Sequence, residues 1–380
     1  MSTIIKNCKV ISPDKEIQKF HIEVENDYIK KIYKKNESLP KSFETIDANG
    51  KMVVPGFIDI HTHGAMGFDV CDGTVKSIEE IAKAKINEGV TSFCPTTLTV
   101  SEELLTKVAY SVEEYKQNRK YAKACGLHLE GPYINKNCLG AQNPKFLRKP
   151  NIQEILHLNS ITKISKVTLA VEVDGGIDLV KELTKLNITS SCGHSAATYA
   201  EFKDAQKYGL THLTHFCNQM TKLHHREIGL VGAGLLDKEV LIEMICDKIH
   251  LVPEMIQLIF NTKNCNLIAL ITDSMVASGL NDGIYDLGGL EVKVENGVAR
   301  LTKDGAIAGS TLLYNRGLKN IYEVTEKPLP ELIKTTSLNQ AKSLKLGRLG
   351  KIEEGYLADI TILDENFTPT DVFINGKRVK

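Results

Sequence analysis

Six residues whose side chains bind metals or move protons stand at similar places in this sequence, at or just after short apolar runs. The first two are His61 and His63, which follow the run 57–60. Residues spaced i, i+2 on a strand point to the same side, so both imidazoles can aim at one point. Neutral imidazole is the commonest metal ligand in proteins. A His-x-His pair also arises by chance, so the other four residues decide between a metal site and ordinary surface or core histidines.

The other four residues each end a separate apolar run. They are Glu130, His194, His215 and Asp273. A buried polar group without a partner is costly, so chance explains one such residue far more easily than six. Imidazoles and carboxylates without a thiolate suit Zn²⁺, Fe²⁺, Mn²⁺ or Co²⁺. Such an ion activates water and polarises a carbonyl, and Asp273 then fits the general base.

The runs that carry these residues belong to a regular alternation of strands and helices. The strand candidates are 57–61, 91–96, 125–130, 166–172, 188–194, 210–215, 241–247 and 267–273. Most are followed by helix-like sequence, which indicates a parallel sheet. Eight such units fit a TIM (β/α)8 barrel, in which catalytic residues sit at the C-terminal ends of the strands. The shared placement of the six residues follows from that architecture.

Both ends of the chain have a different sequence pattern, which is typical of short strands and turns. Residues 1–54 and 350–380 alternate apolar and polar positions, and Asn375-Gly376 is typical of a hairpin turn. We therefore predict a small β-sandwich domain built from both chain termini. The alternating segment 285–302 could add strands to it. The metal-dependent hydrolase barrel would occupy residues 55–349.

Composition excludes several classes of partner. Lysine plus arginine equals aspartate plus glutamate at 47 each, so there is no basic field to attract nucleic acid. No run approaches the roughly 20 apolar residues of a membrane helix, and the first residues lack the apolar core of a signal peptide. The nine cysteines are scattered without paired spacing. We expect a cytoplasmic protein with free thiols, without nucleic-acid or membrane partners.

These motifs resemble the amidohydrolase superfamily and, within it, the N-acetylglucosamine-6-phosphate deacetylase family. The similarity extends from the N-terminal strands to Asn375-Gly376. Its marks include the segments 55–64, 128–133, 193–195 and 215–220, which read PGFIDIHTHG, HLEGPY, GHS and HFCNQM. Many metal hydrolases share His-x-His, whereas the segments 128–133 and 215–220 are much narrower signals.

The resemblance implies an enzyme that hydrolyses N-acetylglucosamine 6-phosphate to glucosamine 6-phosphate and acetate, in amino-sugar catabolism or recycling. Glu130, His194 and His215 would hold the principal metal ion. His61 and His63 would hold a second, with Glu130 bridging, so that each subunit carries one or two ions. Asp273 would be the catalytic base and then the acid.

The resemblance also implies a phosphosugar site shared across a homodimer. The implied substrate-binding residues are Ala141, Gln142, Asn218, Gln219, Arg226, His250, Ile307, Ala308 and Gly309. Arg226 can bond phosphate bidentately and would come from the neighbouring subunit, although the sequence alone favours a surface ion pair. Gln142 stands where some relatives have histidine, and can donate only as a neutral amide. Gln219 stands where a small residue is common, and could narrow the phosphate pocket.

Other functions remain open at this stage. The substrate could be N-acetylgalactosamine 6-phosphate, because the choice of epimer depends on one hydroxyl partner. It could also be an N-acyl amino acid or a cyclic ureide, although the phosphate-binding residue types favour a phosphorylated compound. A non-catalytic assembly protein with this fold would be expected to have lost ligands or the base, and this chain keeps both.

Overall fold

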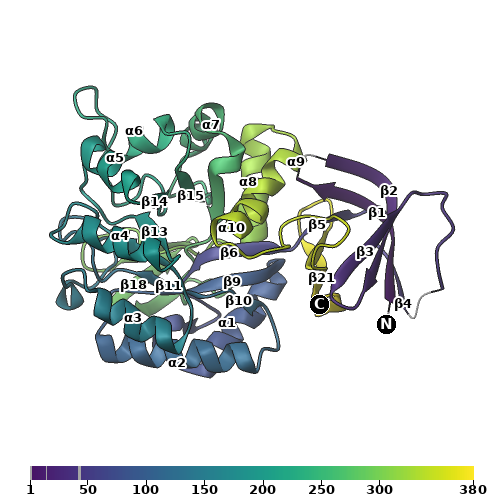
Figure 1. The fold of residues 1–380 in the computed structure, drawn as a ribbon, viewed down its shortest axis with the longest axis horizontal. Helices are drawn as coiled ribbons and strands as arrows, with labels where there is room; N and C mark the ends of the chain where they lie inside the picture. Colours follow the sequence, from purple (N-terminus) through teal and green to yellow (C-terminus); the bar gives the residue numbers. More distant parts are fainter. Residues whose placement is uncertain (1, 14, 42–43) are drawn as a thin grey trace.

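The computed structural model describes residues 2–13, 15–41 and 44–380. Its centre is a nearly closed barrel of eight parallel strands surrounded by helices (Figure 1). In barrel order the strands are β6 (Phe57–Thr62), β9 (Val90–Thr97), β11 (Leu127–Glu130), β12 (Ile164–Leu169), β13 (Thr189–Cys192), β14 (Leu210–Leu213), β15 (Leu241–Ile245) and β16 (Ile268–Ile271). The predicted barrel is confirmed, with a strand in each of the eight predicted runs.

The barrel closes at the end where the chemistry-bearing residues gather. Asp273 N–H donates to the His61 carbonyl at 2.9 Å, and His63 N–H donates to the Ser274 carbonyl at 2.8 Å. These bonds join the chain after β16 to the end of β6. The barrel strands are almost wholly buried, as expected for parallel strands covered by helices.

A helix follows each barrel strand and packs outside it. The helices are α1 (Val75–Asn87), α2 (Glu102–Gln117), α3 (Ile152–Ile161), α4 (Gly176–Lys185), α5 (Tyr199–Lys207), α6 (Gly229–Leu236), α7 (Pro253–Thr262) and α8 (Tyr314–Thr325). Side-chain caps begin several of them: Thr198 and Glu201 form a capping box at α5, and Ser101 caps α2. None of the helices in the described part of the chain is long and apolar enough to cross a membrane.

Short elements complete the barrel domain. They are β7 (Gly64–Ala65), β8 (Phe68–Asp69), η1 (Val70–Asp72), β10 (Lys123–Ala124), η2 (Pro144–Phe146), η3 (Cys265–Leu267), α9 (Leu329–Leu332), η4 (Ile333–Thr336) and α10 (Leu338–Ser343). β10 pairs with β9 beside the N-terminal part of β11, whereas β7 and β8 form a small hairpin just after His63.

Strands from both chain termini form a separate strand-rich domain, seen at the right of Figure 1. They are β1 (Ser2–Ser12), β2 (Lys15–Glu25), β3 (Tyr28–Tyr33), β4 (Glu44–Asp47), β5 (Met52–Pro55), β20 (Ile360–Leu363), β21 (Pro369–Ile374) and β22 (Lys377–Arg378). β5 from the N-terminal part pairs antiparallel with β20 from the C-terminal part. Ile5, Val10, Val53, Ile360 and Phe373 belong to its own apolar core.

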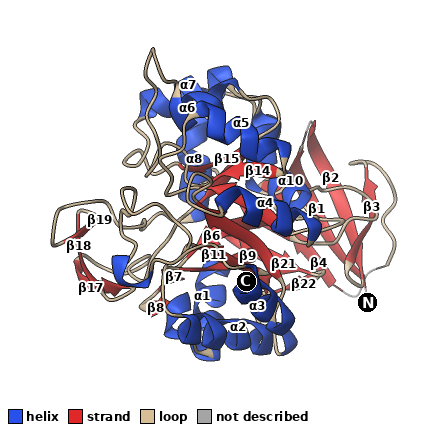
Figure 2. Ribbon diagram, turned by 60° about the vertical axis from the view of Figure 1, so that its left-hand side comes forward, coloured by secondary structure: helices blue, strands red, loops and turns tan. Residues whose placement is uncertain are grey.

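The segment 285–302 does not extend that sheet, so this part of the prediction is wrong. β17 (Gly283–Leu287), β18 (Leu290–Glu295) and β19 (Val298–Leu301) form a three-stranded sheet of their own. Figure 2 shows it on the side of the barrel away from the terminal strands. The reason is its anchorage: the chain leaves the barrel after Asp273 and returns at Ser310, whose N–H donates to the Asp273 carbonyl at 2.7 Å.

Candidate metal centre

Three of the candidate site residues have the same position after a barrel strand and the same kind of backbone conformation. His194, His215 and Asp273 each stand two residues beyond a strand, after β13, β14 and β16. Their φ angles are 49°, 29° and 50°. Residues other than glycine rarely adopt this left-handed backbone conformation. Such backbone strain is concentrated at functional sites. The repeated turn aims all three side chains over the mouth of the barrel.

Glu130, His194 and His215 form one compact group of buried side chains that could hold a metal ion. Oε1 of Glu130 lies 3.0 Å from His215 Nε2 and 3.5 Å from His194 Nε2. The two imidazole Nε2 atoms are 3.1 Å apart. Three ligand atoms therefore converge on one point from β11, β13 and β14.

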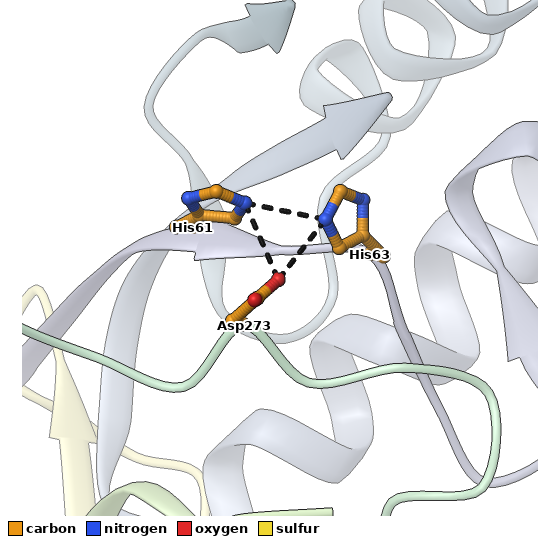
Figure 3. Close-up of side chains that lie close together, drawn as sticks. All are labelled: His61, His63 and Asp273. Atoms are coloured by element: carbon orange, nitrogen blue, oxygen red, sulfur yellow. Dashed lines mark hydrogen bonds and ion pairs between the residues drawn. The ribbon is translucent and has the colours of Figure 1, made fainter. Parts of the chain in front are cut away.

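His61, His63 and Asp273 form a second such group, shown in Figure 3. The two Nε2 atoms lie 3.2 Å apart, and Asp273 Oδ1 lies 3.4 Å from that of His61 and 3.1 Å from that of His63. Glu130 reaches this group too, with Oε1 3.3 Å from His61 Nε2 and Oε2 3.2 Å from His63 Nε2. Its carboxylate therefore stands between the two groups.

The imidazole tautomers show that these groups suit a cation. His194 Nδ1 lies 2.7 Å from the Cys138 carbonyl, and His63 Nδ1 lies 3.1 Å from the Thr96 carbonyl. A carbonyl only accepts, so each Nδ1 carries a proton, and Nε2 of each ring is the nitrogen left to face a cation. Both Nε2 atoms point towards other ring nitrogens and carboxylates. Backbone bonds to the outer nitrogen are also the usual support for metal-bound histidine.

The charges at the site agree with this conclusion. Burial lowers the pKa of His61, but Glu130 and Asp273 outweigh it and raise this pKa to about 9. Burial raises the pKa of Asp273, yet the neighbouring His61 and His63 bring it down to about 2. The carboxylates therefore stay ionised and favour positive charge at the imidazoles.

A buried ion pair beneath the site was not anticipated from the sequence. Lys166 Nζ on β12 lies 2.5 Å from Glu243 Oε1 on β15, and both residues are fully buried. The other carboxylate oxygen of Glu243 lies 3.5 Å from His61 Nδ1. A carboxylate behind a histidine fixes its orientation and raises its basicity as a ligand. The signal in the sequence was a single charge within each apolar strand, which gave no partner.

The site opens into a cavity of about 240 Å³. Its lining includes seven of the predicted substrate-binding residues: Ala141, Gln142, Asn218, Gln219, His250, Ile307 and Gly309. His250 is held by a 2.6 Å hydrogen bond between its Nδ1 and Asp247 Oδ2. Four lining residues were missed, namely Leu98, Gly140, Leu287 and Ala306. Small and apolar side chains carry no chemical signature that singles them out in a sequence.

Two predicted residues do not line this cavity. Ala308 is fully buried behind the lining, where its N–H donates to the Ala299 carbonyl at 3.1 Å. Arg226 is exposed in the loop between Met220 and α6, with Nη1 3.0 Å from His225 Nε2. The structure therefore does not bring Arg226 to this cavity.

The barrel carries two groups of ligand-type side chains, and the second group includes the carboxylate of Asp273. Together these features define a metal-dependent hydrolase. The profile of the Amidohydrolase family matches residues 52–379, and the chain belongs to this family.

Curated relatives share nearly the full length of the chain. It is 33% identical over 369 residues to the N-acetylglucosamine-6-phosphate deacetylase of Lysinibacillus sphaericus, covering 96% of this chain and 95% of the relative. It is 35% identical over 345 residues to the N-acetylgalactosamine-6-phosphate deacetylase of Escherichia coli O157:H7, covering 90% of each.

Solved structures of deacetylases have the same fold. The N-acetylglucosamine-6-phosphate deacetylase of Thermotoga maritima superposes with a TM-score of 0.91 at 37% identity, over 99% of both chains. A mutant of the Mycobacterium smegmatis deacetylase, solved in complex with N-acetyl-D-glucosamine-6-phosphate, gives 0.93 at 26% identity, over 100% of this chain and 99% of that one.

Proposed function

We propose that this protein hydrolyses the acetamide of N-acetylglucosamine 6-phosphate, releasing acetate and glucosamine 6-phosphate. The observation that carries the proposal is the position of Asp273, a buried carboxylate 3.1 Å from His63, in the wall of a cavity that also contains Glu130, His194 and His215. The similarity to named deacetylases over nearly the whole chain supports this substrate. The enzyme would act in amino-sugar catabolism or recycling in the cytoplasm.

We propose that Glu130, His194 and His215 hold the principal divalent ion, and that His61 and His63 hold a second beside the Glu130 carboxylate. The donor set suits Zn²⁺, Fe²⁺, Mn²⁺ or Co²⁺, with one or two ions per subunit. When bound, such an ion polarises the amide carbonyl and lowers the pKa of water.

Asp273 has the position and charge of a general base. With a pKa of about 2 its carboxylate is ionised at neutral pH. It can therefore accept a proton from the attacking water at Oδ1 and then return it to the departing amine nitrogen. Its Oδ1 lies 3.4 Å from His61 Nε2 and 3.1 Å from His63 Nε2, directly beside the proposed metal ligands.

We assign the remaining cavity residues to the sugar and its phosphate. Asn218 and the backbone N–H of Gln219 would contact the phosphate, while His250, oriented by Asp247, would bond a sugar hydroxyl. Ala141 and the segment 307–309, which contains Ile307, Ala308 and Gly309, would border the sugar ring.

We also propose that the chain divides into a barrel domain, 55–349, and a terminal domain, 1–54 with 350–380.

Arg226 would complete the phosphate site from the neighbouring subunit of a homodimer. Arg226 is exposed and does not line the cavity of its own chain. This position supports the proposal, because an exposed guanidinium can extend into the site of a partner subunit. Phosphate is the ligand that such a planar donor bonds best.

The deciding experiment measures acetate release from N-acetylglucosamine with and without the 6-phosphate. The protein is first stripped with a chelator and then reloaded with single metals. We expect release from the phosphorylated sugar, loss after chelation and recovery on metal addition. Equal rates on both sugars would remove the phosphate assignment, and full activity after verified metal removal would remove the metal assignment.

A second candidate substrate is N-acetylgalactosamine 6-phosphate, because the E. coli O157:H7 relative with this printed activity is 35% identical to the chain. The two epimers differ only in the direction of one hydroxyl. The same assay run with both phosphosugars compares their kcat/KM values and decides between them.

A further inference from the structure

The side chain of Gln142 is held at both ends of its amide. Thr99 N–H donates to Gln142 Oε1 at 2.7 Å, and Gln142 Nε2 donates to Glu130 Oε2 at 2.6 Å. A backbone N–H can only donate, so the amide oxygen must face Thr99 and the NH₂ group must face the carboxylate. Only 3% of Gln142 is exposed, although it borders the cavity.

The two oxygens of Glu130 have different surroundings. Oε1 faces the Nε2 atoms of His215, His194 and His61 at 3.0 to 3.5 Å. Oε2 lies 3.2 Å from His63 Nε2 and accepts the 2.6 Å hydrogen bond from Gln142 Nε2. A hydrogen bond to a charged carboxylate is among the stronger kinds.

The local backbone keeps this amide in place. Thr99 follows the end of β9, whereas Gln142 lies in the loop after β11, where its own N–H donates to the Leu139 carbonyl at 2.9 Å. The close approach also needs Gly131, since a Cβ there would lie 2.2 Å from Thr99 Oγ1. The Gln142 amide thus joins the end of β9 to the carboxylate that ends β11.

We infer that Gln142 is a positioning residue for Glu130, which it orients so that Oε1 faces His194 and His215 while Oε2 faces His63. This rests on the proposed metal-dependent function. The role differs from the substrate contact expected for this residue from the sequence. One Nε2 hydrogen is already committed to Glu130, and the amide oxygen is committed to Thr99, so the main effect of Gln142 is on how the ions are held.

The test compares metal affinity in the wild-type protein, Gln142→Met and Gln142→Asn. Methionine keeps the length of the side chain without its donor, whereas asparagine keeps the amide but is too short to span Thr99 and Glu130. Each chelator-stripped protein is titrated with Zn²⁺ against a chromogenic chelator. We expect both variants to bind about 10- to 100-fold more weakly, with unchanged thermal unfolding of the metal-free proteins.

Kinetics supply the second readout. At saturating Zn²⁺ the variants should recover most of their kcat with an unchanged KM, because the substrate contacts remain. The matched control is Gln219→Met, the other glutamine of the same cavity, which should leave Zn²⁺ affinity unchanged.

Three outcomes separate the possibilities. Wild-type affinity in both Gln142 variants overturns the inference and leaves the proposed function standing. Wild-type affinity with a lower kcat at saturating Zn²⁺ also overturns it, and assigns Gln142 to the substrate carbonyl instead. A wild-type protein that binds no Zn²⁺, Fe²⁺, Mn²⁺ or Co²⁺ removes both the inference and the metal-dependent function.

Discussion

Lys85 and Asp59 form a fully buried ion pair in which Nζ lies 3.1 Å from Oδ2. Lys85 comes from α1 outside the barrel, whereas Asp59 lies on β6 just before the His-x-His pair. Asp59 accepts a hydrogen bond from the Thr272 hydroxyl at 2.6 Å, and Lys85 donates to the Ser274 hydroxyl at 3.0 Å. The pair therefore forms hydrogen bonds to the residues on both sides of Asp273 and links them to β6.

Lys85→Met should destabilise the fold strongly, because it leaves Asp59 and Glu88 buried without their cation. Removing one partner of such a pair costs about 3–5 kcal/mol, to be measured as the free energy of unfolding in urea. The control is Lys83→Met on the same helix, where a 54% exposed side chain pairs with Glu80 across 3.6 Å. Exposed pairs contribute about 1 kcal/mol or less. Equal losses in the two variants would contradict the role given to Lys85.

Asp273→Asn should stop acetate release while the protein keeps a metal ion. Asparagine has nearly the shape of aspartate but cannot carry the proton, so kcat should fall by about 10²- to 10⁴-fold. The principal ligand group does not include Asp273, and the metal content measured by mass spectrometry should stay at one ion or more per subunit. Retained activity would remove the general-base role, and complete loss of metal would make Asp273 a principal ligand instead.

Arg226→Ala should raise KM for the 6-phosphorylated sugar and leave the unphosphorylated sugar unaffected. Loss of a charge-assisted bond to phosphate corresponds to about 1.5–3 kcal/mol, which is roughly 10- to 150-fold in KM. The control is Lys222→Ala, a neighbouring cation in the same loop. Equal weakening of both sugars would contradict the phosphate assignment.

Mixed dimers test where Arg226 acts. If it crosses the interface, subunits with Asp273→Asn and subunits with Arg226→Ala together form one intact site in each heterodimer. Unfolding and refolding the two inactive or weakened proteins as a mixture should then restore low-KM activity. The absence of any restoration, with heterodimers verified by mass spectrometry, would place Arg226 in the site of its own subunit.

Much of the barrel could be predicted because its strands are buried on both faces. Such strands appear in the sequence as continuous apolar runs, and the polar residues that follow them must have partners. His194, His215 and Asp273 were found in this way. Their positive φ angles could not be predicted, because histidine and aspartate at these positions do not indicate a left-handed backbone conformation. Alternation also identified β17, β18 and β19 as strands without saying which sheet they join.

Partners distant in sequence were beyond prediction from one chain. Lys166 and Glu243 each interrupt an apolar run, which shows that each needs a partner, yet they lie 77 positions apart. The contact between Gln142 and Glu130 is similar, since it depends on how the loop after β11 folds back over the barrel. These contacts are products of the closed barrel, which brings strand ends together irrespective of their spacing along the chain.

Acid should weaken the fold at Asp237, which ends α6 away from the metal centre. Burial raises its pKa, but hydrogen bonds from the Val240 and Glu239 amides and from Lys203 lower it to about 2. The unfolded value is about 3.9, so the unfolded chain binds the proton more readily. The carboxylate therefore contributes up to about 2 kcal/mol of stability above pH 4, and this is lost as the pH falls towards 2. Asp237→Asn should be less stable than wild type at pH 7, and the gap should narrow by pH 3 in urea unfolding curves. A constant gap between pH 7 and pH 3 would show that the ionised carboxylate makes no contribution there.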